Sequence, residues 1–265
     1  MEPMTAAPDR VAEAPDEVAR DTGTGAPGPA PIRRWRRRLR WLPLVPPLVV
    51  IVVAVTAWVV TPSVGDAQDR VRTLAAAHGV STLATELPDR VAAAVLAVED
   101  HRFYRHLGID SLALPRAARG ILTGDDGGGA TIEVQLAKWL YTGGRRDHRD
   151  QAEQAVLAPK LDARWSKRQI LLMYLNTVYF GHGYYGVSTA SQGYFGLPPD
   201  QLDWAQAALL AAVLKAPESF DPRRHPETAL ERRDYSLRRL AAVATITPQE
   251  LATAQRSGLE LSPGP

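Results

Sequence analysis

Apolar and polar positions along this chain follow a helical period over most of its length. Val91, Val95 and Val98 form a stripe at i, i+4 and i+7 that ends at Glu99, and this spacing places side chains on one face of a helix. Alanine and leucine fill the stretch that follows Asp203, a residue typical of a helix N-terminus. Alternation with a period of two is nearly absent. The pattern therefore predicts a mainly α fold.

Helix start signals predict further elements. Ser166 and Gln169 have the spacing of a capping box. Pro226 suits the first turn of another helix, and Thr247, followed by proline, opens a last one. The stretch 124–129 contains three consecutive glycines, which cannot hold a helix, so it is predicted to be a flexible loop.

One apolar run differs from this pattern. Residues 41–60 read WLPLVPPLVVIVVAVTAWVV and contain no charge. At 1.5 Å per residue, a helix of this length covers about 30 Å, the thickness of the hydrocarbon core of a bilayer. The run is therefore predicted to form a transmembrane helix over 41–61, with 48–60 as its most regular part because three prolines precede it. A cleaved signal peptide is the alternative, but 61–65 offers no clear cleavage site.

Charge is unevenly distributed along the 265 residues, although the net charge is only +2 and cysteine is absent. Residues 1–32 sum to −4, residues 33–40 carry six arginines, and the charges after Val60 sum to zero. Basic residues beside an apolar span favour the cytoplasmic side. The cluster therefore indicates membrane topology, with an outer domain beyond the plasma membrane, and not nucleic acid binding. The lack of cysteine excludes disulfides and thiolate catalysis.

Composition and pattern together predict five segments. Residues 1–40, acidic at first and then Arg-rich, form a disordered cytoplasmic tail. The membrane helix over 41–61 leads through a membrane-proximal segment, 62–82, to a helical domain over 83–245. Residues 246–265 form a C-terminal helix and tail.

The first cluster of candidate catalytic side chains begins at Glu99. Residues 99–110 read EDHRFYRHLGID. A carboxylate at the end of an apolar stripe is expected to be partly desolvated, which suits a general base; a solvated acid at a helix end is the structural alternative. The pattern E-D-x-x-F-x-x-H-x-G-x-D resembles the first signature of the family 51 peptidoglycan glycosyltransferases. The matching residues are Glu99, Asp100, Phe103, His106, Gly108 and Asp110.

The second cluster is a glycine-rich stretch that leads into a helical pattern. Residues 128–138 read GGATIEVQLAK and resemble the family's G-G-S-T-I-T-Q-Q-L-A-K, with departures at 130, 133 and 134. The backbone N–H groups of such a loop, and a lysine in the following helix, suit a pyrophosphate. Taken alone, Lys138 is more typical of a solvated helix face. The resemblance implies substrate contacts for Gly129, Thr131, Gln135 and Lys138.

A third resemblance covers residues 166–187, SKRQILLMYLNTVYFGHGYYGV. The family reads roughly K-x-x-I-L-E-x-Y-L-N-x-x-Y-F-G-x-G-x-Y-G in this region. Aromatic residues beside glycines either pack in a core or build a sugar-stacking cleft, and the residues alone leave both open. The resemblance implies substrate contacts for Asn176, Tyr179 and Gly181, and for Phe103 and His106 of the first cluster.

A further family signature, R-K-x-x-E-A, is not kept. Its charged positions hold Asp150, Gln151 and Gln154, so two cations and one acid are missing. Arg149 and Glu153 lie one residue earlier, and on a helix this shift rotates a side chain by about 100°. Arg145, Arg146 or Arg149 is therefore needed to replace the lost cations. The candidate substrate contacts in this region are Arg146, Arg149, Glu153 and Gln154.

The resemblance implies a lysozyme-like, two-lobed glycosyltransferase domain that polymerises lipid II into β-1,4-linked glycan strands and releases undecaprenyl pyrophosphate. Glu99 would act as the base, and Asp100 is the second catalytic candidate. Lys138, nearby arginines or a divalent cation, Mg²⁺ or Mn²⁺, would neutralise the leaving group; no metal ligands are assigned. The expected partners are lipid II, the growing strand, the membrane and other cell-wall synthesis proteins.

Two other functions stay open from the sequence. The missing acid and cations fit a catalytically impaired relative that binds lipid II or acts as a scaffold. A lytic glycan hydrolase normally needs a second carboxylate that flanks the scissile bond, whereas Asp100, next to Glu99 in sequence, should point away from it on a helix.

Overall fold

The structure, a computed structural model, describes residues 45–80, 82–113, 130–145 and 147–263. The predicted cytoplasmic tail, its arginine cluster and the glycine-rich loop lie outside these residues. The chain divides into two units, residues 1–50 and 51–265. Of the first unit, the structure describes the opening residues of helix α2.

Helix α2 covers Val45–Val60 of the predicted apolar span. Residues 41–44 lie outside the described residues, and Thr61, the last residue of the predicted helix, follows the end of α2. Pro46 and Pro47 lie in its first turn, where proline is tolerated because the missing N–H has no helical partner. None of the helices in the described part of the chain is both long and apolar enough to cross a membrane.

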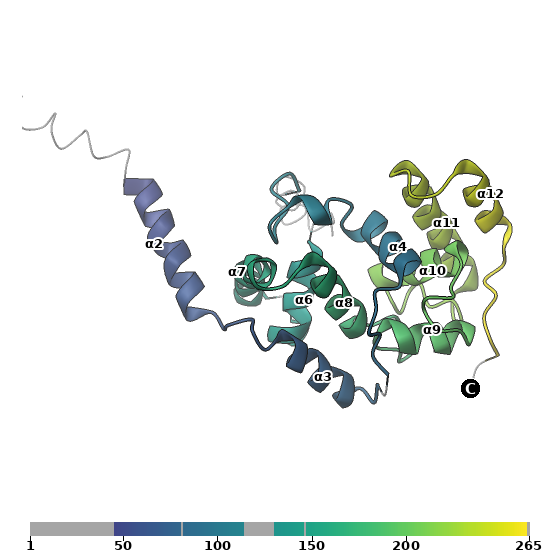
Figure 1. Cartoon of the computed structure of the whole chain (residues 1–265), viewed down its shortest axis with the longest axis horizontal. Helices are drawn as coiled ribbons and strands as arrows, with labels where there is room; N and C mark the ends of the chain where they lie inside the picture. The colour runs from purple at the N-terminus through teal and green to yellow at the C-terminus, as the bar shows by residue number, and fades with distance from the viewer. Residues whose placement is uncertain (1–44, 81, 114–129, 146, 264–265) are drawn as a thin grey trace, which may run out of the picture. The chain divides into compact units, whose positions relative to one another are not determined.

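The second unit is built from helices, as Figure 1 shows, and the prediction of a mainly α fold is confirmed. Its described residues contain no strand, only an isolated bridge between Tyr179 and Tyr185. In chain order the elements are α3 (Ala67–Ala77), α4 (Asp89–Glu99), the 3-10 turn η2 (Phe103–Arg105), α6 (Ile132–Tyr141), α7 (His148–Arg164), α8 (Lys167–Thr177), α9 (Val187–Phe195), α10 (Trp204–Lys215), α11 (Pro226–Ala242) and α12 (Pro248–Arg256).

Side-chain caps begin several of these helices where the sequence predicts a start. Ser166 and Gln169 form the predicted capping box of α8. Asp203 caps α10 and Thr247 caps α12 in the same reciprocal way. Each cap satisfies N–H groups that have no partner within the helix and contributes about 1 kcal/mol.

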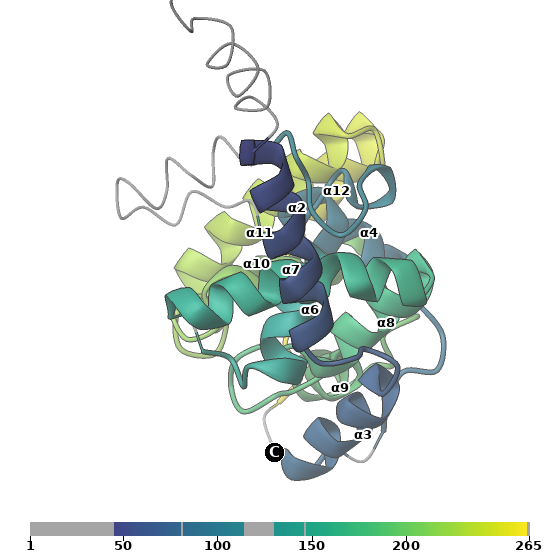
Figure 2. The same ribbon diagram turned by 90° about the vertical axis from the view of Figure 1, so that its left-hand side faces the viewer.

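The helices of the second unit pack in two sets. In the first set, α10 lies against α4, α11 and α12; in the second, α6 lies against α3, α7 and α8. Figure 1 and Figure 2 show both sets, and α8 and α9 connect them through a smaller contact. Helix α10 is buried on all sides from Ala205 to Val213, which explains its continuous apolar sequence. The two sets agree with the predicted two lobes, while the likeness to lysozyme stays a prediction.

Candidate active site

Glu99 is the last residue of α4, and a two-step hydrogen-bond relay holds its half-buried carboxylate. Gln135 Nε2 donates to Glu99 Oε2 at 2.8 Å, and the Tyr174 hydroxyl donates to Gln135 Oε1 at 2.9 Å. Burial, and then the charge of Glu99, raises the pKa of Tyr174 well above its ordinary value. The Tyr174 hydroxyl therefore stays a donor, and this turns the NH₂ group of Gln135 toward Glu99.

The relay joins the two sets of helices, because Glu99 comes from α4, Gln135 from α6 and Tyr174 from α8. An amide is a neutral donor. It orients the carboxylate without cancelling its charge, and this is the state that a general base needs before it accepts a proton.

Asp100, the residue after the helix, is engaged inside the protein. Both of its carboxylate oxygens lie 3.0–3.1 Å from His106 Nε2, and Oδ2 also accepts the backbone N–H of Ile132 at 3.1 Å. Ile132 begins α6, where a negative charge is favoured. Asp100 and His106 are both 7% exposed. Asp100 is thus held by partners within the protein, and its predicted catalytic role, like the predicted substrate contact of the buried His106, stays a prediction.

Thr131 and Gly108 clamp the first two sequence clusters together. Thr131 Oγ1 donates to the Gly108 carbonyl at 2.6 Å and accepts the N–H of Val134 as the N-cap of α6. Gly108 has φ +84°, and a Cβ there would lie 2.6 Å from the Ala158 carbonyl of α7. Only glycine fits this close approach, so the loop after Glu99 is held between α6 and α7.

Three residues predicted to contact substrate have partners within the protein, and their predicted roles stay predictions. Phe103 is 1% exposed and belongs to the core. Asn176 exchanges two hydrogen bonds with the backbone of Ala84, at 2.8 and 2.9 Å. A Cβ on Gly181, which has φ +78°, would lie 2.6 Å from the Pro217 carbonyl. Each of these residues is fixed by a neighbour within the protein.

Tyr179 is only partly buried, and it lies in a group of aromatic rings. Its hydroxyl donates to Glu218 at 2.7 Å and accepts the N–H of Gly183, and burial is the main reason that its pKa is raised. The Tyr179 and Tyr185 ring centroids are 4.7 Å apart, and Tyr185 stacks on His78 at 3.6 Å. The predicted sugar-stacking role of Tyr179 fits this group and stays a prediction.

Helix α7 carries the departures from the family signature, and the structure gives two of them partners. Gln154 Nε2 donates to Thr142 Oγ1 at 2.7 Å and to the Arg145 carbonyl at 3.0 Å, so it fastens the turn between α6 and α7. Asp150 accepts two hydrogen bonds from the Arg145 guanidinium, at 2.8 and 3.1 Å. These bonds lower the pKa of Asp150 and raise that of Arg145. Arg145 is therefore already paired.

Helices α6 and α7 carry further cations that were predicted to contact a pyrophosphate. Lys138 is half-buried, lies three residues after Gln135 and so shares its helix face; its ammonium is 5.2 Å from the Trp139 ring. Arg149 is exposed and Glu153 half-buried. Gly129 and Arg146, both predicted to contact substrate, lie outside the described residues.

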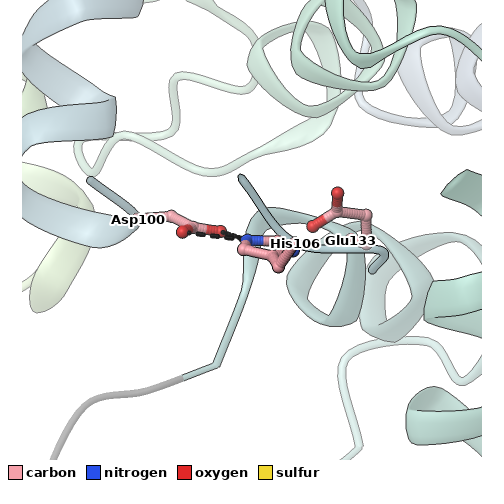
Figure 3. Close-up of side chains that lie close together, drawn as sticks. All are labelled: Asp100, His106 and Glu133. Carbon is pink, nitrogen blue, oxygen red and sulfur yellow. Dashed lines mark hydrogen bonds and ion pairs between the residues drawn. The ribbon is translucent and has the colours of Figure 1, made fainter. Parts of the chain in front are cut away.

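Metal-binding groups are found at the start of α6 and not at Gln154. Gln154 has an amide in place of the family's carboxylate, and its NH₂ group is used in the turn, so this side chain offers a cation no negative charge. Within the described ranges, Asp100, His106 and Glu133 form the group of side chains that could hold a metal ion (Figure 3).

Tyr174 and Glu133 are two site residues that were not predicted from the sequence. Glu133 is fully buried and pairs with Lys167, which also contacts Asp162 at 2.7 Å; burial raises the pKa of Glu133 against the effect of Lys167. The signal for Glu133 was available, because residues 133, 137 and 140 share the buried face of α6 at i, i+4 and i+7. A carboxylate at such a position needs a buried partner.

The transglycosylase family model matches residues 68–241, about two thirds of the chain. The chain therefore belongs to the transglycosylase family, the family of glycosyltransferases that its sequence clusters predict.

The chain is similar to several penicillin-binding proteins. It is 41% identical to penicillin-binding protein 1A of Aquifex aeolicus over 173 residues, 64% of this chain and 24% of that protein. It is 40% identical to penicillin-binding protein 1F of Bacillus subtilis over 178 residues, 66% of this chain and 25% of that protein. Penicillin-binding protein 1A of Mycobacterium tuberculosis is 37% identical over 173 residues, 63% of this chain and 21% of that protein. The chain thus spans about a quarter of the length of these relatives.

Proposed function

We propose that this chain is a peptidoglycan glycosyltransferase that joins lipid II units into β-1,4-linked strands and releases undecaprenyl pyrophosphate. The observation that carries the proposal is the relay from Tyr174 through Gln135 to Glu99, which orients a charged carboxylate at the end of α4. Membership of the transglycosylase family supports the same reaction class.

Glu99 is the general base in this proposal. It takes the proton from the 4-hydroxyl of the acceptor GlcNAc while that oxygen bonds to the anomeric carbon of the donor MurNAc. The bond from this carbon to the pyrophosphate oxygen breaks on the opposite side, and the electron pair leaves with the pyrophosphate. The anomeric centre is inverted, which gives the β link. A positioned base contributes about 10²- to 10⁴-fold to such a step.

The leaving pyrophosphate needs positive charge more than it needs a proton. Lys138 supplies it from the same face of α6 as Gln135, and Arg149 supplies more from the start of α7. Fixed cations directed at a developing negative charge cost no reorganisation during the reaction.

The proposed working place is the outer surface of the plasma membrane, because both substrates carry lipid tails. The apolar residues 41–60 and the preceding arginines support attachment through the N-terminal segment, with the N-terminus cytoplasmic. The catalytic domain proposed over 83–245 and the C-terminal helix would then lie outside the cell.

The test uses the full chain in detergent with labelled lipid II and Mg²⁺, and glycan strands are separated by gel electrophoresis. The Glu99→Gln variant keeps the shape of the side chain and removes the base, so we expect its turnover to fall by about 10²- to 10⁴-fold. The exposed Glu231→Gln on α11 is the matched control and should polymerise like the wild type. A Glu99→Gln enzyme within tenfold of the wild type would overturn the proposal.

A second candidate is a relative that binds lipid II without turnover, and the Arg145–Asp150 pair favours it because that pair removes a cation from the substrate side. Bound lipid II with no strand formed by the wild type would select this candidate, and cleavage of preformed strands would select a hydrolase. Gln154→Glu is not expected to restore activity, since it would place a carboxylate against the Arg145 carbonyl.

A further inference from the structure

Asp100, His106 and Glu133 come together from three separate parts of the chain. Asp100 follows α4, His106 follows η2, and Glu133 lies in the first turn of α6. Figure 3 shows the imidazole of His106 between the two carboxylates. One donor atom from each residue lies within 4.8 Å of the other two, and all three side chains are buried.

Two atoms of this cluster have no hydrogen-bond partner. They are Nδ1 of His106 and Oε2 of Glu133, both buried beyond the reach of solvent. Glu133 is 0% exposed, and the side chain of His106 is 4% exposed. A buried polar atom without a partner costs about 1–3 kcal/mol, so two such atoms within one buried cluster indicate that a further group completes it.

The charges of the cluster support the same conclusion. Three carboxylates lie in and beside the cluster, those of Asp100, Glu133 and Asp162. The ammonium of Lys167 contacts Glu133 and Asp162. By formal charge, three carboxylates and one ammonium leave two negative charges in excess. Buried charge that is not compensated is strongly unfavourable. One divalent cation would bring the cluster to neutrality.

We propose that Asp100, His106 and Glu133 form a binding site for one first-row divalent cation such as Zn²⁺ or Mn²⁺. An imidazole together with carboxylates suits these ions, whereas Mg²⁺ and Ca²⁺ prefer oxygen ligands alone. Two ligands of one tetrahedral ion lie about 3.4 Å apart. The ion would therefore replace the hydrogen bond between Asp100 and His106 Nε2, and the carboxylate of Glu133 would move toward that side of the ring. Lys167 contacts the other oxygen of Glu133 and so orients this ligand from outside the site.

The ion would stabilise the site around Glu99 and would not take part in the chemistry. It connects the residue after Glu99 to the first turn of α6, the helix that presents Gln135 to the base. The site is separate from the pyrophosphate side, where Gln154 leaves no suitable carboxylate. Position 133 is threonine in the family pattern, so the site belongs to chains that carry an acid there.

The test measures metal binding to the untagged full chain after treatment with a chelator. Zn²⁺ is titrated in competition with a chromophoric chelator, and Co²⁺ is added separately as a probe whose visible absorption reports its ligands. We expect one ion per wild-type chain, and an affinity at least tenfold lower in Glu133→Gln. The exposed Glu231→Gln variant controls for binding at the surface and should match the wild type.

Hydrogen exchange on the wild type locates the ion without any variant. Zn²⁺ should slow amide exchange in residues 100–108 and 131–136, and it should raise the melting temperature of the wild type but not that of Glu133→Gln. If Glu133→Gln does not fold, Glu133→Thr replaces it. Three outcomes would each overturn the proposal: no one-to-one binding, equal affinity in the folded variant, or protection elsewhere in the chain.

Discussion

Gln135 accepts a hydrogen bond from Tyr174 and donates one to Glu99, so its amide cannot turn over without losing both. The Tyr174 hydroxyl, which stays protonated, therefore fixes the orientation of the Glu99 carboxylate through Gln135. The two donors of this relay, a phenol and an amide, are both neutral. They hold the carboxylate of Glu99 in one orientation, as proton transfer to a positioned base requires.

Removal of the hydroxyl at the end of the relay should therefore affect turnover more than binding. In Tyr174→Phe the buried Oε1 of Gln135 loses its donor and the amide is free to rotate, so we expect kcat to fall about tenfold while KM stays close to the wild-type value. Steady-state polymerisation of labelled lipid II measures both constants. Tyr235→Phe, on the exposed side of α11, should leave both unchanged. A rise in KM at constant kcat would contradict the relay.

The Arg145–Asp150 pair gives a pH dependence whose sign follows from its pKa shifts. The pKa of Asp150 is lowered in the folded chain, chiefly by hydrogen bonds from Arg145. Its stabilising contribution is therefore present above the ordinary carboxyl pKa of about 4 and is lost as the pH falls through the lower, folded value. We expect Arg145→Gln to be less stable than the wild type at neutral pH, with a difference that shrinks below about pH 4. Urea unfolding across this range measures it, and a difference independent of pH would argue against the pair.

At the scale of elements, the N-terminus of α6 is where separate segments of the chain are joined. Asp100 binds its first N–H group, Thr131 caps it and also holds Gly108, and Gln135 reaches Glu99 one turn later. The helix thus aligns the loop after α4 and the catalytic carboxylate at the same time. A change in the loop should be transmitted to the base through α6.

Gly108 and Gly143 provide a matched pair to measure this. Both have positive φ, +84° and +58°, but a Cβ on Gly108 would lie 2.6 Å from the α7 backbone, whereas one on Gly143 would meet open space. Gly143→Ala should cost about 1 kcal/mol for the backbone conformation alone. Gly108→Ala should cost about 2–4 kcal/mol, because the contact with α7 must also open, and should lower polymerisation. Urea unfolding of both variants tests this, and equal losses would contradict the clamp.

The elements were easier to predict than the contacts between them. The stripe ending at Glu99 and the capping box at Ser166 are local patterns, and both are confirmed. The relay is not local, since Gln135 and Tyr174 are 39 residues apart. Motif positions also do not separate residues that bind substrate from residues that hold the fold. Phe103 and Asn176, predicted to contact substrate, both have partners within the protein. Glu133 looked like a departure because only the packing of α6 shows that it is buried.

At the scale of the molecule, the end of α7 holds the segment that follows α2. Lys160 is 8% exposed, and its ammonium donates to the carbonyls of Thr61 and Pro62 at 2.9 and 3.1 Å. Trp165 donates to the Val64 carbonyl at 2.8 Å. Burial lowers the pKa of Lys160, which is a cost that the three carbonyl and hydroxyl acceptors offset. Residues 61–64 are thus tied to the end of α7, the helix that also carries Asp150 and Gln154.

Lys160→Met keeps the apolar stem and removes the ammonium, so the carbonyls of Thr61 and Pro62 lose their donor. We expect a loss of about 1–3 kcal/mol in the free energy of unfolding, together with faster amide exchange and earlier proteolysis near residues 61–64. The exposed Arg168→Met variant on α8 is the control and should stay within about 0.5 kcal/mol of the wild type. Unchanged exchange at 61–64 in a destabilised Lys160→Met chain would mean that Lys160 stabilises α7 alone. Faster exchange confined to 61–64 would show that Lys160 holds these residues against α7.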